Sequence, residues 1–172
     1  MKKIAIISAI MALSATQTAM AADGVINFTG NITDTACVVD VSSATQTVDL
    51  GTISVGAFSA GNGATAAAKR FNILLNSCPE SVSSAAVRFD GNTDTSNSSI
   101  LALNSGATAN NVGVAIYEQD SNTLIPLGAS SASVDLESDA TNTLTYFAKY
   151  MATGSVGPGT ANATASFTVV YQ

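Results

Sequence analysis

The amino-acid sequence predicts an all-β fold, an antiparallel β-sandwich, on three observations. Apolar and polar residues alternate with period two in several short segments. Clusters rich in glycine, asparagine and serine, which favour turns, separate these segments. Bulky apolar residues are spaced between Ser, Thr, Asn and Gly, a composition that favours strands over long helices. Short strands interrupted this often are typical of a sandwich.

The first residues have the order of a secretory signal peptide. Lys2 and Lys3 give a positive start, and residues 4–13 form an apolar run too short to span a bilayer. Residues 19–21, Ala-Met-Ala, fit the small-residue pattern after which a signal peptidase cuts. We expect a signal peptide over residues 1–21 and export of the chain, with cleavage after Ala22 as the alternative.

The next segment has the pattern of a strand, although chain ends are usually frayed and polar. Polar residues of 24–33 occupy one face of this strand, and the other face carries Ile26, Phe28, Gly30 and Ile32. The opposite end of the chain, residues 165–172, alternates in the same way up to the last residue. Both ends of the processed chain are therefore expected to be strands.

Between these ends, six segments have the alternation of strands. They are residues 48–50, 71–75, 87–89, 112–117, 134–136 and 144–150. Turns are predicted at residues 61–63, 90–92, 104–106 and 154–159. Residues 64–69, which include an alanine run, are the one place where a helical turn is expected.

The cysteine content predicts a disulfide. Cys37 and Cys78 are the chain's two cysteines, and an exported chain passes through an oxidising compartment where two thiols within reach become bonded. In the chain-entropy model, closing a loop of this length stabilises the fold by about 4 kcal/mol. Two cysteines without a histidine do not make a zinc site, and their spacing is not that of a redox pair.

The composition excludes several classes of function. There is no histidine, so Ser-His-Asp and Cys-His catalysis are excluded, and no metal or cofactor site is expected. The nearest group of carboxylates, Asp135, Glu137 and Asp139, is interpreted as a solvated face. The net charge is −6, and it becomes about −8 once the signal peptide is removed. Such a chain lacks the clustered Lys and Arg that nucleic acid requires of a partner.

Several motifs together resemble a known family. They are Thr35-Ala36-Cys37-Val38-Val39-Asp40, the second cysteine in Asn76-Ser77-Cys78, a penultimate Tyr171, and Gly159 as the fourteenth residue from the C-terminus. With the signal peptide and the patterned N-terminal segment, they resemble a major pilin of type 1 fimbriae, from the chaperone–usher pilin family. The resemblance covers essentially the whole processed chain, although the segment before Gly24 is shorter than in many major pilins.

The resemblance implies an incomplete immunoglobulin-like β-sandwich that is completed by a donor strand from another subunit or from a chaperone. Residues 22–33 would be the donor-strand arm and residues 34–172 the pilin domain. Ile26, Phe28, Gly30 and Ile32 of the arm would enter the groove of another subunit. On the acceptor side, the implied groove and chaperone residues are Gly159, Phe167, Val169, Tyr171 and Gln172, and Gln172 would carry the carboxylate that a chaperone holds.

The implied function is that of a structural subunit of an adhesive fimbria outside the cell. Its partners would be identical or related pilins, a periplasmic chaperone and an outer-membrane usher. Two alternatives stay open, a minor or adaptor subunit of the same pathway and a secreted, self-complete β-sandwich that binds a ligand. A hydrolase that acts through carboxylates is a weaker alternative, since the sequence has no other catalytic pattern.

Overall fold

The computed structural model describes residues 26–30, 32 and 36–172, and the chain divides into two units, 1–32 and 33–172. The predicted signal peptide lies outside the described residues. In the first unit, residues 26–30 and 32 belong to no helix or strand, and Ile26, Phe28 and Ile32 are exposed. In the part of the chain that the structure describes, no helix has the length and apolarity needed to cross a membrane.

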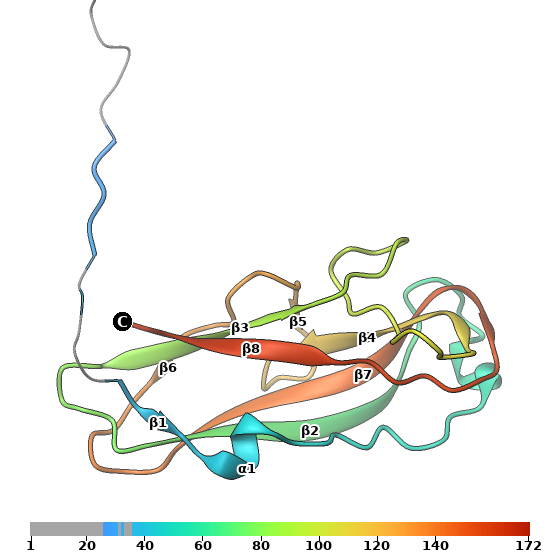
Figure 1. Cartoon of the computed structure of the whole chain (residues 1–172). Coiled ribbons are helices and arrows are strands. Elements are labelled where there is room, and N and C mark those ends of the chain that lie inside the picture. The colour runs from blue at the N-terminus through green and yellow to red at the C-terminus, as the bar shows by residue number, and fades with distance from the viewer. Residues whose placement is uncertain (1–25, 31, 33–35) are drawn as a thin grey trace, which may run out of the picture. The chain divides into compact units, whose positions relative to one another are not determined.

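The second unit is the antiparallel β-sandwich that the sequence predicts (Figure 1). Within residues 36–172, one sheet has five strands in the order β1-β2-β7-β4-β5 and the other has three in the order β6-β3-β8. The strands are β1 (Val38–Val39), β2 (Thr65–Asn76), β3 (Ser84–Gly91), β4 (Asn110–Tyr117), β5 (Leu124–Ile125), β6 (Val134–Asp135), β7 (Asn142–Gly157) and β8 (Ala165–Tyr171). The helical elements are the short α1 (Val41–Ala44) and the 3-10 turn η1 (Val55–Phe58).

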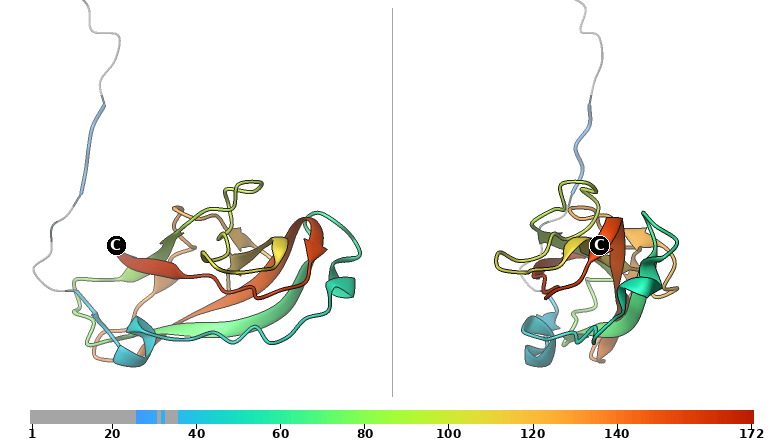
Figure 2. Two further views of the ribbon diagram at one scale, coloured as in Figure 1. Left: turned by 45° about the vertical axis from the view of Figure 1, so that its right-hand side comes forward. Right: turned by 90° about the vertical axis from the view of Figure 1, so that its right-hand side faces the viewer.

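The two ends of this unit, the disulfide end and the η1 end, differ in the elements they contain. The disulfide end holds β1, the Cys37–Cys78 bond and the C-terminal end of β8. The η1 end holds η1 and the connection from β7 to β8, residues 158–164. Figures 1 and 2 show β8 running from the η1 end toward the disulfide end, in the layer that covers β2 and β7.

The core lies between the two sheets and centres on three aromatic side chains. The rings of Phe71, Phe89 and Tyr146 come from both sheets, with centroids 5.1 to 6.0 Å apart. The Tyr146 hydroxyl lies 3.1 Å from the Ser131 hydroxyl oxygen, which also accepts a hydrogen bond from the amide of Val87 at 2.9 Å. Burial raises the pKa of Tyr146 to about 12, so this phenol remains neutral and hydrogen-bonded between the sheets.

Most of the predicted strands are present, but several local predictions were wrong. Residues 64–69 form no helical turn, because Thr65 starts β2 and pairs with β7, which overrides the helix propensity of the alanines. The bulge between Ala66 and Lys69 is the irregularity left in that strand. The turn predicted at 154–159 starts only after residue 157, since β7 continues to Gly157, which pairs with Asn110. Residues 90 and 91 of another predicted turn belong to β3.

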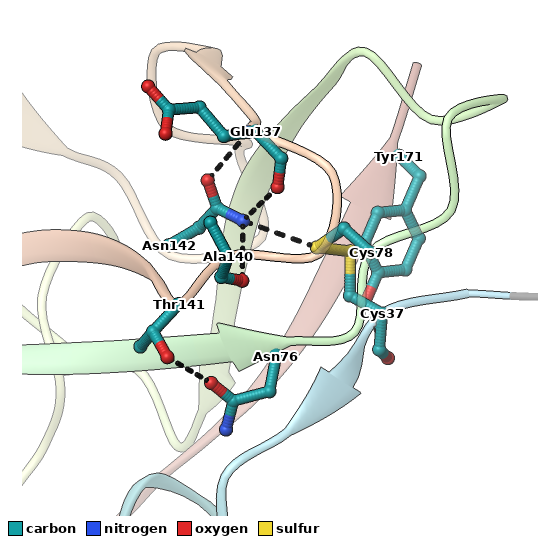
Figure 3. The surroundings of a disulfide bond; sticks show 8 residues. All are labelled: Cys37, Asn76, Cys78, Glu137, Ala140, Thr141, Asn142 and Tyr171. Atoms are coloured by element: carbon teal, nitrogen blue, oxygen red, sulfur yellow. Dashed lines mark hydrogen bonds between the residues drawn. A yellow bond between two sulfur atoms is a disulfide. The ribbon is translucent and has the colours of Figure 1, made fainter.

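The structure contains the predicted disulfide between Cys37 and Cys78, 41 positions apart (Figure 3). Both cysteines are buried, and the bond ties the chain just before β1 to the chain just after β2. The side-chain amide of Asn142 lies 3.5 Å from the Cys78 sulfur and donates to the carbonyl of Glu137. The Tyr171 hydroxyl donates to the carbonyl of Cys37, so the last strand is also attached to this end.

We expect the double substitution Cys37→Ser and Cys78→Ser to lower the free energy of unfolding by about 4 kcal/mol, because the unfolded chain regains the entropy of an open loop. Urea denaturation of both proteins measures the difference. Reduction of the unsubstituted protein serves as the control and should produce a similar loss. A change below about 1 kcal/mol would contradict the stabilising role assigned to the bond.

Candidate functional site: an open groove beside β8

β8 is an edge strand whose only strand partner in the described residues is β3. On the far side of β3, the carbonyls of Val87 and Phe89 accept hydrogen bonds from the amides of Ser131 and Gly128. Successive residues of a strand direct their backbone groups to opposite edges. The residue between them, Arg88, therefore directs its backbone toward β8.

The pairing register then shows which backbone groups of β8 have no strand beside them. Arg88 pairs with Thr168, so Thr168 faces β3. Its neighbours Phe167 and Val169 direct their amides and carbonyls to the opposite edge, where the described residues provide no backbone partner. Since β8 is long and its inward side chains are apolar, this edge is suited to pair with another strand.

A second unbonded segment lies opposite this edge. Residues 45–53 make no backbone–backbone hydrogen bond with any described residue. They are held at both ends, by α1, where Leu74 donates its amide to the Ser43 hydroxyl at 2.9 Å, and by η1, where Phe58 is buried. Residues 48–50 belong to no strand, so the strand predicted there was wrong.

Between these two segments lies a groove in two connected parts, with cavity volumes of about 670 and 510 Å³. The parts share Gly51, Tyr150, Ala161 and Asn162, so the groove is continuous from Ser43 and Phe167 to the η1 end. The walls are formed by residues 43–55 and 156–167. Such a long opening between two chain segments has the shape of a site for an extended peptide.

The floor of the groove is apolar. In the larger part it is formed by Phe71, Phe89, Leu101, Val114, Ile116, Ala148 and Tyr150, and in the smaller part by Phe58, Val112 and Tyr150. Most of these side chains also belong to the core, so the core of the sandwich is open along this line. An apolar side chain that entered the groove would therefore complete the core.

The groove carries little charge. Among the described residues that line it, Asp49 is the charged one, and its carboxylate accepts a hydrogen bond from the amide of Gly51 at 2.8 Å. The Tyr150 hydroxyl donates to the carbonyl of Ala161 at 3.0 Å. Burial raises the pKa of Tyr150, and the nearby Asp49 carboxylate adds to this effect. The lining therefore favours an uncharged, apolar occupant.

Some of the residues predicted for the acceptor side line the groove and others do not. Phe167 lines the groove, whereas Val169 and Tyr171 pack against the core closer to the disulfide end. The Gln172 carbonyl accepts hydrogen bonds from the amides of Ser83 and Ser84, so the C-terminus is attached to the start of β3. The floor side chains were missed in the sequence, because a period-two pattern does not say which strands lie beside an opening.

Gly159 lines the smaller part of the groove at the η1 end. A Cβ atom at this position would overlap the backbone of Thr108 and Ala109. Both of these residues donate their amides to the carbonyl of Thr160 at 3.1 Å. Glycine is therefore required here because the chain that leads into β8 lies against another backbone segment.

The predicted arm residues belong to the first unit of the chain, and their position relative to the groove is not determined. Ile26 is 78% exposed, Phe28 91% and Ile32 fully exposed, and no described atom lies within 4 Å of the position of a Cβ at Gly30. Three large apolar side chains exposed within seven residues are unusual for a chain segment without a partner.

The carboxylates considered as a catalytic group are exposed. Asp135, Glu137 and Asp139 lie on the surface at the disulfide end. In the described residues, no group of His, Cys, Asp and Glu side chains is arranged to hold a metal ion. These positions agree with the solvated face expected from the sequence.

Comparisons with known proteins agree with this geometry. The family described as fimbrial protein matches residues 26–172. The A chain of the type-1 fimbrial protein of Escherichia coli K12 is 42% identical over 153 residues, which are 87% of this chain and 84% of that protein. The fimbrial subunit type 1 of Klebsiella pneumoniae is 39% identical, with 99% and 98% covered. A crystal structure of an antigen and type I fimbria protein of Burkholderia pseudomallei matches with a TM-score of 0.61 at 36% identity, covering 85% of this chain and 96% of that one.

We expect Gly159→Ala to destabilise the protein by about 1–3 kcal/mol, because the added methyl group forces apart the backbone segments at residues 108 and 159. Urea denaturation measures this change. Gly56→Ala is the matched control, since a Cβ there would make only an ordinary contact, at 3.5 Å, with the Ser54 hydroxyl. Equal stability of the two variants would show that the close approach at Gly159 is not needed.

Proposed function

This chain belongs to the fimbrial protein family, and we propose that copies polymerise by inserting the N-terminal arm of each, residues 22–33, into the groove of the next. As a member of this family the chain is a structural subunit of an extracellular fimbria and not an enzyme. Its body is an incomplete immunoglobulin-like sandwich that lacks the strand beside β8. The observation that carries the proposal is the pair of unbonded backbone edges on either side of an apolar groove.

The arm has the side chains that such a groove requires. Ile26, Phe28 and Ile32 alternate along one face of an extended chain, and burial of each contributes about 1.5–3 kcal/mol, or roughly 5–9 kcal/mol together before ordering costs. The arm's backbone can also pair with β8 on one side and residues 45–53 on the other, at about 1 kcal/mol net for each hydrogen bond. Gly30, with no side chain, allows the arm's backbone to approach a shallow part of the floor.

The direction of the inserted arm follows from the need to repeat the contact. Each arm begins from the disulfide end of its own body, close to Cys37. Suppose that the C-terminal part of the arm left the neighbour's groove at the neighbour's disulfide end. The neighbour's own arm also leaves from that end, so two other bodies would have to lie there. If the C-terminal part leaves at the η1 end, each body uses one end for each neighbour, and the fibre continues without limit. The arm then runs antiparallel to β8, with Ile32 nearest the η1 end.

We further propose that a periplasmic chaperone fills the groove before polymerisation and that an outer-membrane usher assembles the fibre. An open edge strand beside exposed apolar side chains is an aggregation hazard in a newly exported subunit. Complementation of pilins by a chaperone strand is an established example of strand addition. The carboxylate of Gln172 is proposed to be held by basic chaperone residues, and residues 1–21 to be the export signal.

The test uses a body that lacks residues 22–30 and a synthetic peptide of residues 22–33. We expect the body, refolded from urea, to melt at a markedly higher temperature with the peptide than without it, because the peptide supplies the missing strand. Calorimetry with and without the peptide measures this. A well-behaved monomer that melts at the same temperature without the peptide would contradict the proposal.

Within the peptide, we expect Phe28→Ala to weaken binding by about 10–100-fold, the loss of one large buried side chain. Thr29→Ala is the matched control, since Thr29 lies on the other face of the extended arm and should change the affinity by less than about threefold. Titration of each peptide against the shortened body gives the affinities. Equal losses for the two peptides would indicate that the arm does not bind with its apolar face inward.

A further inference from the structure

β1, at the disulfide end, and the start of the adjoining α1 carry two apolar side chains that nothing in the described residues covers. Val38 of β1 is 59% exposed, and Val41, the first residue of α1, is 86% exposed. Both lie directly after the arm in the sequence. Apolar residues in this position would be exposed in a single subunit, but they lie close to the next body once the arm is inserted.

The length of chain between the arm and these residues limits where they lie. Val38 lies six positions after Ile32 and Val41 lies nine, which correspond to at most about 22 and 32 Å of extended chain. This step rests on the proposed function, in which Ile32 sits at the η1 end of a neighbour's groove. Val38 and Val41 of one copy are then within reach of the rim of that groove end.

That rim is apolar and small. Val55, the first residue of η1, is 45% exposed, and Pro158 lines the groove on the opposite side. Residues 52–66, 103–112 and 152–164, which form this end, contain no charged residue. The rim therefore offers an uncharged surface to an apolar neighbour.

The charges of the two ends disfavour a contact between two disulfide ends. Residues 36–44, 76–84 and 133–143 form the disulfide end and contain carboxylates and no basic residue. The carboxylates are Asp40, Glu80, Asp135, Glu137 and Asp139. Two disulfide ends repel one another, whereas a disulfide end and an η1 end do not.

We propose that Val38 and Val41 of one copy pack against the η1-end rim, Val55 and Pro158, of the copy whose groove holds its arm. This contact is a second interface between successive subunits, besides the inserted strand. It limits how two bodies rotate about the short chain that joins them.

The test places a photo-reactive benzoylphenylalanine at position 41 in otherwise native fibres. After irradiation, mass spectrometry identifies the cross-linked peptides, and we expect them to come from residues 53–58 or 156–160 of a neighbouring copy. The same label at Gln119, an exposed residue after β4, is the control and should not reach these peptides. If the bulky label at position 41 prevents fibre formation, the label is placed at position 38.

The outcomes separate the two proposals. Fibres that form but give cross-links only to other segments, or none, overturn the contact and leave strand insertion standing. Failure of the unlabelled chain to form fibres, seen by electron microscopy, overturns strand insertion itself. Cross-links from position 41 to a second position 41 would show disulfide ends in contact and overturn both the contact and the assigned direction.

Discussion

The backbone amides and carbonyls on the outer edge of β8 need hydrogen-bond partners, and the groove is arranged around this need. Phe167 and Val169 direct these groups away from β3, toward residues 45–53, which are unbonded as well. Water can satisfy such groups, but it would then cover an apolar floor at a cost in free energy. An extended segment with alternating apolar side chains satisfies both demands at once, because it brings two rows of backbone groups and one row of side chains.

The groove is open in the structure because both of its walls are held independently of any occupant. β8 is bonded along β3, and residues 45–53 are fixed by α1 at one end and η1 at the other. The disulfide and the Tyr171–Cys37 hydrogen bond attach the adjoining ends of the chain to each other. A site held in this way loses little conformational entropy when a strand enters, so more of the interaction energy contributes to affinity.

In the proposed assembly, the unlike ends of the body give the fibre its direction. The disulfide end is acidic and joins the arm, while the η1 end is uncharged and lines one end of the groove. A contact between unlike ends has no closed symmetry and repeats indefinitely, as a linear polymer requires. In that assembly, the residues that fix the fold at each end also determine how copies are arranged.

The fold class, the disulfide and most strands could be predicted from the amino-acid sequence alone. Residues 71–75, 87–89, 112–117, 144–150 and 165–171 lie in β2, β3, β4, β7 and β8, because period-two alternation is a local property that survives in the folded state. It also excluded histidine-dependent catalysis, and its motifs indicated the family. The folded structure was needed to show that residues 48–50 belong to no strand and which core side chains form the floor of the groove. It was also needed to show that Phe167 lines the groove while Val169 and Tyr171 lie closer to the disulfide end. Those features depend on which strands become neighbours, and strand pairing is made by residues far apart in the chain, where local alternation carries no information.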